Sequence, residues 1–220
     1  MTNQDNFILD SVDPEIGERI DRGKRSLLMQ RALPALALTS APLLVAAAST
    51  EAFAAGGLPQ SVVDVLNFAL TLEYLEAAFY AKGNSSPGLI PDKYKAMFAT
   101  IGAHETAHVA LLQGALGTAA VKAPGVDFTA KGKYADVFEN FKTFATLSAT
   151  FEDLGVAAYK GQAGNLAGTP VLTTALQIHS VEARHASAVR PLIGKPGHIT
   201  AFDQPKTKAQ VLKAATPFLA

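Results

Sequence analysis

Glu105-Thr106-Ala107-His108 and Glu182-Ala183-Arg184-His185 share one pattern, a glutamate followed three positions later by a histidine. Residues three apart lie on the same face of an α-helix, one turn from each other. A carboxylate and an imidazole placed in this way can bind a metal ion from one side. The two segments therefore predict two helices that face a shared metal site.

A lone glutamate stands in an apolar run upstream of each segment. Glu105 follows Glu73 by 32 positions, and Glu182 follows Glu152 by 30 positions. This repeat of about 78 residues is too long for a solenoid and suits two helical hairpins packed face to face. Each hairpin then supplies one lone glutamate and one Glu-x-x-His pair.

This set of side chains is typical of a two-metal carboxylate site inside a four-helix bundle. The predicted metal ligands are Glu73, Glu105, His108, Glu152, Glu182 and His185. A carboxylate on the apolar face of a helix is costly unless it is paired or metal-bound, and few basic side chains share these faces. The alternative is surface salt bridging on amphipathic helices, which the duplication and the apolar surroundings disfavour.

Four further side chains are candidates for contacts with the ligands themselves: Tyr80, Tyr159, His179 and Glu76. Each tyrosine follows a lone glutamate by two turns, and a packed tyrosine that hydrogen-bonds a carboxylate is favoured over one with a redox role. His179 stands one turn before Glu182 on the same face. Glu76 stands one turn after Glu73, but its counterpart in the second half is Gly155. The sequence therefore favours Glu73 as the ligand and a solvated or outer position for Glu76.

The helix pattern predicts an all-α bundle. Helices are expected at residues 61–82, 91–116, 135–162, 172–192 and 206–215, with Ser61 as an N-cap. The loops inside each hairpin are short, and one long connection covers residues 117–134. Short loops within two hairpins and one long crossover between them define a known bundle topology. The tail is expected to cap the bundle with Phe218.

The chain resembles the ferritin-like superfamily, and more narrowly the bacterial ferritin-like proteins related to plant desiccation-associated proteins. The resemblance rests on the residues 67–80, 104–108 and 182–185, on Glu152, and on the tail residues 201–205, 211–212 and 217–218. It implies a ferritin-like four-helix bundle with a long crossover connection and a short C-terminal extension. It also implies two iron or manganese ions.

By the same resemblance, Glu105 and Glu182 would bridge the two ions. Glu73 and His108 would complete the ligands of one ion, and Glu152 and His185 would complete those of the other. Storage ferritins usually lack the second histidine of this set. In this respect the chain is closer to rubrerythrins, manganese catalases and di-iron oxidases.

Composition sets limits on the class of protein. A chain of 220 residues with 49% hydrophobic residues can build one domain with a full core. Cysteine is absent, which excludes disulfides, thiolate zinc sites, iron–sulfur clusters and cysteine nucleophiles. The formal net charge is zero, so the sequence predicts no nucleic-acid partner.

Residues 1–54 have the features of an export signal. Basic residues at 22–31 precede the apolar run 32–48, and Ala52-Phe53-Ala54 is a small-x-small cleavage site. The basic part resembles a twin-arginine motif, with Lys24 where the first arginine belongs. The pattern favours cleavage after Ala54 over an uncleaved membrane anchor, because the apolar run is shorter than the ~20 residues that span a bilayer. Residues 55–220 would then form the exported domain, with 14 basic and 12 acidic side chains.

These features lead to one functional hypothesis and two alternatives. The first is an exported di-iron or di-manganese protein of the periplasm or cell envelope, with redox chemistry on dioxygen or peroxide in stress protection. Its activity would be of the peroxidase, catalase or ferroxidase type, in a monomer or small homo-oligomer. The alternatives are an iron sequestration or storage protein and a structural desiccation-stress protein with a stabilising metal site. A bundle that keeps its ligands but does little chemistry stays open.

Overall fold

The computed structural model describes residues 57–220, and the predicted export signal at residues 1–54 lies outside them. The described residues form five α-helices: α4 (Gln60–Ser85), α5 (Asp92–Leu116), α6 (Phe141–Gln162), α7 (Val171–Val189) and α8 (Lys208–Ala215). They contain no β-strand, which confirms the predicted all-α fold. None of these helices is both long enough and apolar enough to cross a membrane.

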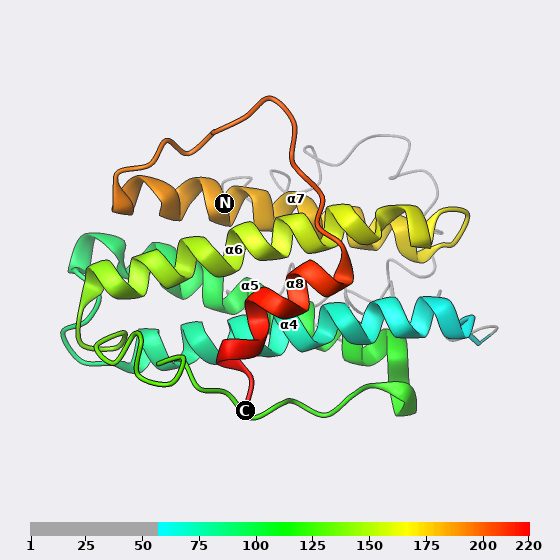
Figure 1. Cartoon of the computed structure of the whole chain (residues 1–220), viewed down its shortest axis with the longest axis horizontal. Helices are drawn as coiled ribbons and strands as arrows, with labels where there is room; N and C mark the ends of the chain where they lie inside the picture. Colours follow the sequence, from blue (N-terminus) through cyan, green and yellow to red (C-terminus); the bar gives the residue numbers. More distant parts are fainter. Residues whose placement is uncertain (1–56) are drawn as a thin grey trace, which may run out of the picture. The chain divides into compact units, whose positions relative to one another are not determined.

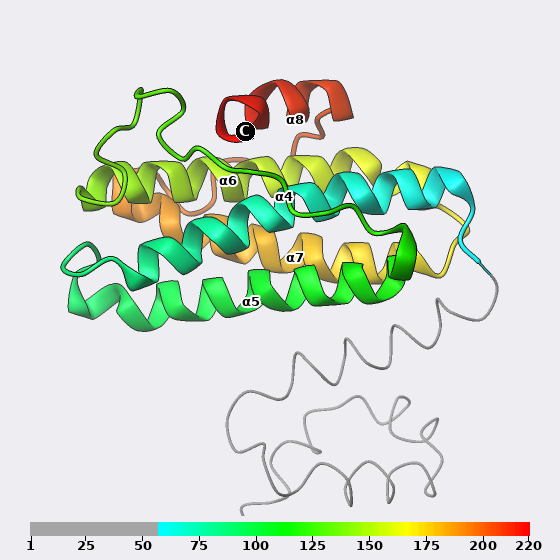
Figure 2. The ribbon, with the colours of Figure 1, turned by 90° about the horizontal axis from the view of Figure 1, so that it is seen from below.

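Two antiparallel hairpins make up the bundle. α4 packs mainly on α5, and α6 packs mainly on α7. The connection between the hairpins, residues 117–140, runs along the bundle from the end of α5 to the start of α6 (Figure 2). This arrangement is the predicted crossover topology.

The C-terminal extension lies on the outside of the bundle. α8 packs on α6 (Figure 1), and Phe218 places its ring 4.8 Å from that of Phe151. The backbone N–H of Ala220 donates to the carbonyl of Gly125, which ties the end of the chain to the crossover. The tail therefore covers one face of the bundle, and Phe218 is buried against it.

Several helix ends differ from the prediction, by one to six residues. α6 begins at Phe141 and not at residue 135, because the Asn140 side chain accepts hydrogen bonds from the backbone N–H groups of Lys142 and Thr143 and so caps the helix there. α4 begins at Gln60, after Pro59, so Ser61 is inside the helix and is not its cap. α7 ends at Val189 and continues as a 3₁₀ turn, Arg190–Ile193.

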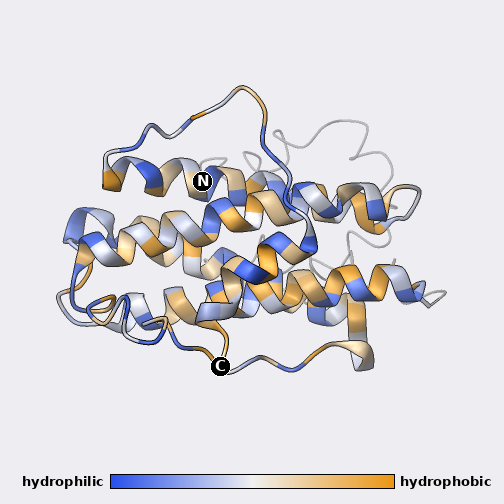
Figure 3. Ribbon diagram, in the orientation of Figure 1, coloured by the Kyte–Doolittle hydropathy of each residue, from blue (hydrophilic) through white to orange (hydrophobic). Residues whose placement is uncertain are grey.

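The core has two parts of different composition, at opposite ends of the bundle. Apolar positions recur along helices α4 to α7 between polar ones (Figure 3). We call one part the aromatic core, formed by Phe79, Tyr80, Phe98, Phe144 and Phe151 with their apolar neighbours. We call the other the aliphatic core, formed by Leu66, Ala69, Leu112, Leu166 and Ile178 with the ring of Tyr159.

Candidate metal centre

The six predicted ligands lie together between the two cores, near the middle of the four long helices. α4 supplies Glu73 and α6 supplies Glu152, while α5 and α7 supply the two Glu-x-x-His pairs. All four glutamates are 0% exposed, and His108 and His185 are 8% and 5% exposed. Four ionisable carboxylates without access to water need a compensating charge, because desolvation of each costs several kcal/mol.

Each histidine turns its Nδ1 atom toward the carboxylates. Nδ1 of His108 lies 3.2 Å from Oε2 of Glu73, 3.1 Å from Oε2 of Glu105 and 3.1 Å from Oε1 of Glu182. Nδ1 of His185 lies 2.9 Å from Oε1 of Glu105 and 3.2 Å from Oε2 of Glu152. One imidazole therefore contacts carboxylates from three different helices.

Two groups of four ligand atoms can each hold an ion. The members of each group offer atoms that all lie within 4.8 Å of one another. The first group contains Glu73, Glu105, His108 and Glu182, and the second contains Glu105, Glu152, Glu182 and His185. Both groups include Glu105 and Glu182, so these two carboxylates are placed to serve two ions at once.

Several of these atoms lie close to one another but make no hydrogen bond of acceptable geometry, although they are fully buried. Within the described residues they are Oε1 of Glu105, Oε2 of Glu152, both oxygens of Glu182 and Nδ1 of His185. Buried polar atoms without a partner are rare in folded proteins. Since they converge with the other ligand atoms, their chemistry fits a bound cation.

Two tyrosines hold the lone glutamates across the hairpins. The hydroxyl of Tyr159, on α6, donates to Oε1 of Glu73 at 2.5 Å. The hydroxyl of Tyr80, on α4, donates to Oε1 of Glu152. Each bond leaves the second oxygen of its carboxylate free to face the histidines. The tyrosines thus have the hydrogen-bonding position that the sequence favoured, but each holds the glutamate of the opposite hairpin.

Glu76 is 3% exposed, which excludes the solvated position and leaves the outer position beside the ligands, the other one that the sequence favoured. The reason is its counterpart Gly155, which leaves room for it. A Cβ atom at Gly155 would lie 3.4 Å from Oε1 of Glu76 and 3.0 Å from Oε2 of Glu182. Burial, together with the charges of Glu182 and the other nearby carboxylates, raises the pKa of Glu76 well above its ordinary value. Glu76 thus adds a fifth buried carboxyl group beside the ligands.

His104 is a contact of the site that sequence reasoning missed. Its Nδ1 lies 2.9 Å from Nε2 of His185, and the two rings stack at 5.2 Å. A metal-binding histidine usually has such a partner on its second ring nitrogen, which fixes the ring. The corresponding position in the other half is Val181, so the internal repeat gave no signal for His104.

His179 lies away from the cluster. Its Nε2 atom is 3.8 Å from Oδ2 of Asp203, which belongs to the tail. The sequence placed it against Glu182, one turn further along α7, but the structure gives it no hydrogen bond there. The arginine of this helix end, Arg190, donates to Asp153, so it compensates an outer carboxylate rather than the buried ones.

The protonation of the cluster reflects its burial. Burial raises the pKa of Glu182 to about 8, and the charges of nearby glutamates add to this effect. Burial also raises the pKa of Glu105 to about 7, with the Glu182 charge adding to it. Burial alone would lower the pKa of His185, but its contacts with Glu105 and Glu152 raise that pKa to about 10. Without a metal ion, the site therefore keeps protons at neutral pH, and a cation can replace them.

The chain was compared with protein-family models and with curated proteins, and the first comparison found a match that covers this site. A family model described as a ferritin-like domain matches residues 61–195, which covers all six predicted ligands. The match spans more than half of the 220 residues. No curated protein matches the chain.

Proposed function

The chain belongs to the ferritin-like family, and on that premise we propose that it is an exported di-metal protein with redox chemistry on dioxygen or peroxide. One observation carries the proposal. Buried carboxylate oxygens and an imidazole nitrogen without hydrogen bonds converge in two overlapping groups that share Glu105 and Glu182. Membership of the family accounts for the bundle, and the buried donor atoms of this chain favour a bound metal.

Charge supports two ions rather than one. Two divalent cations carry the charge that compensates Glu73, Glu105, Glu152 and Glu182, with both histidines neutral. A single ion would leave buried negative charge that only protons could compensate. Carboxylates with a minority of imidazoles suit iron or manganese better than softer ions. Shared carboxylates are typical of ions about 3.5–4 Å apart.

The side chains around the ligands would fix their orientation. Tyr80 and Tyr159 each hold one oxygen of a lone glutamate by hydrogen bonding. His104 holds the outer nitrogen of His185. Bound iron or manganese would supply the electron transfer to the oxidant, and the surrounding core would exclude bulk water from it.

The alternatives differ in measurable ways. Iron storage needs a closed shell of many subunits, so a very large particle in size-exclusion chromatography would favour it. A structural role is supported by one observation, since the ligands come from all four long helices and an ion would tie them together. Export and a stress role rest on the pattern at residues 1–54 and on the resemblance, and they belong to the proposal.

Metal analysis with activity measurements tests the proposal. We expect about two equivalents of iron or manganese per chain, with oxidation of iron(II) by dioxygen or turnover of peroxide. The exposed residues Glu139 and His198 provide matched controls, as Glu139→Gln and His198→Ala. Two bound ions without either activity would contradict the redox function and leave the structural role.

A further inference from the structure

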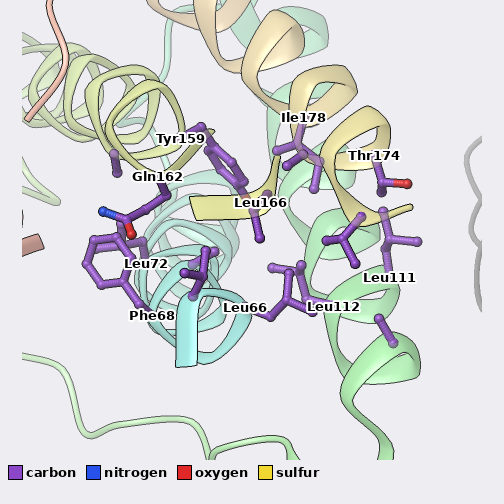
Figure 4. A pocket seen from close by; sticks show the side chains of 16 residues that line it. Leu66, Phe68, Leu72, Leu111, Leu112, Tyr159, Gln162, Leu166, Thr174 and Ile178 are labelled. Carbon is purple, nitrogen blue, oxygen red and sulfur yellow. The ribbon is translucent and has the colours of Figure 1, made fainter. Parts of the chain in front are cut away.

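The aliphatic core contains a cavity beside the metal centre. The centre of a water-sized sphere can move within about 20 Å³ of this cavity. Side chains from all four long helices and from the 3₁₀ turn after α6 line it, and Figure 4 shows Leu66, Leu112 and Leu166 among those that point toward a common space. The lining residues include Ala69, Leu112, Tyr159, Leu166 and Ile178.

The cavity lies one helical turn from the predicted ligands of one ion. Ala69 precedes Glu73 by four positions, and Leu112 follows His108 by four. Residues four apart share a helix face, so the lining side chains and the ligands point into the same interior. The ring of Tyr159 lines the cavity, while its hydroxyl donates to Glu73. The Tyr159 side chain therefore reaches from the cavity to a predicted ligand on this side of the centre.

The lining offers no partner for a polar guest. Tyr159 gives its hydroxyl to Glu73, and Oε1 of Gln162 accepts a hydrogen bond from Asn165. The amide group of Gln162, with its nitrogen, points away from the space between the other lining side chains (Figure 4). The hydroxyl of Thr174 points away from the other lining side chains (Figure 4). A space of about 10–15 Å³ is enough for a water, but a water also needs two to four polar partners. The cavity thus has room for one small molecule and excludes water on chemical grounds.

We propose that this cavity binds a small apolar gas, dioxygen, and delivers it to the Glu73–His108 side of the centre. Hydrogen peroxide is a poor occupant, since it would lose its hydrogen bonds to water without replacement. Half-buried Ala115 and Thr174 form the outer part of the lining, between α5 and α7, and provide the side from which a gas molecule enters. The delivery step rests on the proposed function, whereas gas binding does not.

Gas binding is tested on crystals of the purified protein pressurised with krypton, an apolar gas whose anomalous scattering marks its position. We expect a krypton site among Ala69, Leu112 and Ile178. Ala69→Val fills the cavity and should remove the site, whereas the exposed Ala99→Val should keep it. Leu166→Ala enlarges the cavity and should increase the occupancy. If the parent protein and Leu166→Ala both bind no krypton there, the proposed site is wrong.

Delivery is tested by stopped-flow mixing of the metal-loaded, reduced protein with dioxygen. Ala69→Val should slow the reaction with dioxygen several-fold, with an unchanged number of bound ions and an unchanged reaction with peroxide. An unchanged dioxygen rate in a variant that has lost krypton would overturn delivery. If the loaded parent protein binds krypton but reacts with no oxidant, the proposed function fails and so does delivery, while the gas site stands.

Discussion

The two sides of the metal centre have nearly the same ligands but different surroundings. On one side, Tyr80 holds Glu152 and is packed against the rings of Phe79 and Phe98, at 5.4 and 6.2 Å. On the other side, Tyr159 holds Glu73 and borders the cavity. The two halves of the chain thus have matching ligands and tyrosines, while the side chains behind them differ.

This difference implies that the two ions would not be equivalent. The aromatic side is filled by stacked and edge-on rings. That side also has His104 behind His185. The aliphatic side has the cavity and no such histidine. We therefore expect the aromatic side to hold its ion firmly and the aliphatic side to meet the oxidant.

The largest effect is expected from the shared ligand Glu105. Glu105→Ala should lose most of both ions, because this carboxylate belongs to both groups of ligand atoms. His108→Ala and His185→Ala should each keep about one tightly held ion, on the opposite side. Metal content after dialysis against a weak chelator measures this, with His198→Ala as the control. Two tightly held ions in either histidine variant would contradict the two-sided model.

Metal removal should make stability depend on pH. In the metal-free folded state, Glu182 keeps its proton up to a pKa of about 8 and His185 up to about 10, whereas their ordinary pKa values are 4.5 and 6.5. The folded state then binds more protons than the unfolded chain, so stability falls as pH rises from about 5 to about 10. Glu73 has the opposite effect on stability. Burial would raise its pKa, but the charge of His108 and the hydrogen bonds outweigh burial and lower that pKa, so Glu73 makes the protein less stable as pH falls below its ordinary pKa of 4.5.

Urea unfolding at a series of pH values measures this dependence. The protein with bound manganese should show a weaker loss of stability over the same range, because the ions replace the protons. At a free ion concentration 100 times its dissociation constant, each site adds about 2.7 kcal/mol. Parallel curves for the two forms would mean that the ions do not compete with these protons.

The ligand set follows from the sequence because it depends on helical spacing alone. Residues three or four apart must share a face, and so Glu105 and His108 had to lie together once the segment was helical. The predicted start of α6 was six residues too early, because the helix-like pattern in the sequence begins before Asn140, whose side chain caps the helix. The spacing of residues in the sequence predicted neither the contact of His104 nor the cavity. Both depend on how side chains from different helices fill the space between them, which periodicity does not record.

The two tyrosines allow a direct test of the comparison. Tyr80→Phe and Tyr159→Phe each remove one hydroxyl and leave a buried carboxylate oxygen without its donor, on opposite sides. Loss of such an orienting bond typically costs about 10–100-fold in metal affinity. We expect each variant to weaken only the ion of its own side. The reaction with dioxygen should change more in Tyr159→Phe, since this ring borders the cavity.

Chelator competition separates the two affinities, and stopped-flow mixing with dioxygen gives the rate. Tyr94→Phe serves as a control, because the Tyr94 ring stacks on Phe141 away from the ligands. Equal changes in the dioxygen rate for both tyrosine variants would show that the oxidant does not distinguish the two sides.

The smallest effect is expected at Gly155. This residue is the counterpart of Glu76, and it is a difference between the two halves that lies directly beside a ligand. Alanine is a better helix former than glycine by about 1 kcal/mol, so Gly155→Ala alone would stabilise α6. The added Cβ would, however, lie 3.0 Å from Oε2 of Glu182 and displace this shared carboxylate by a few tenths of an ångström. We expect an affinity loss of up to about ten-fold at both ions, because Glu182 serves both groups.

Gly164→Ala is the matched control for this substitution, because a Cβ there would meet no atom within 4 Å. For Gly155→Ala, chelator titration should show a lower metal affinity. Thermal unfolding of the metal-free protein should show a stability that is no lower than that of the parent. Unchanged metal binding would mean that Glu182 has room to move. The space beside Gly155 would then serve only to accommodate Glu76, and this difference between the two halves would have no effect on metal binding.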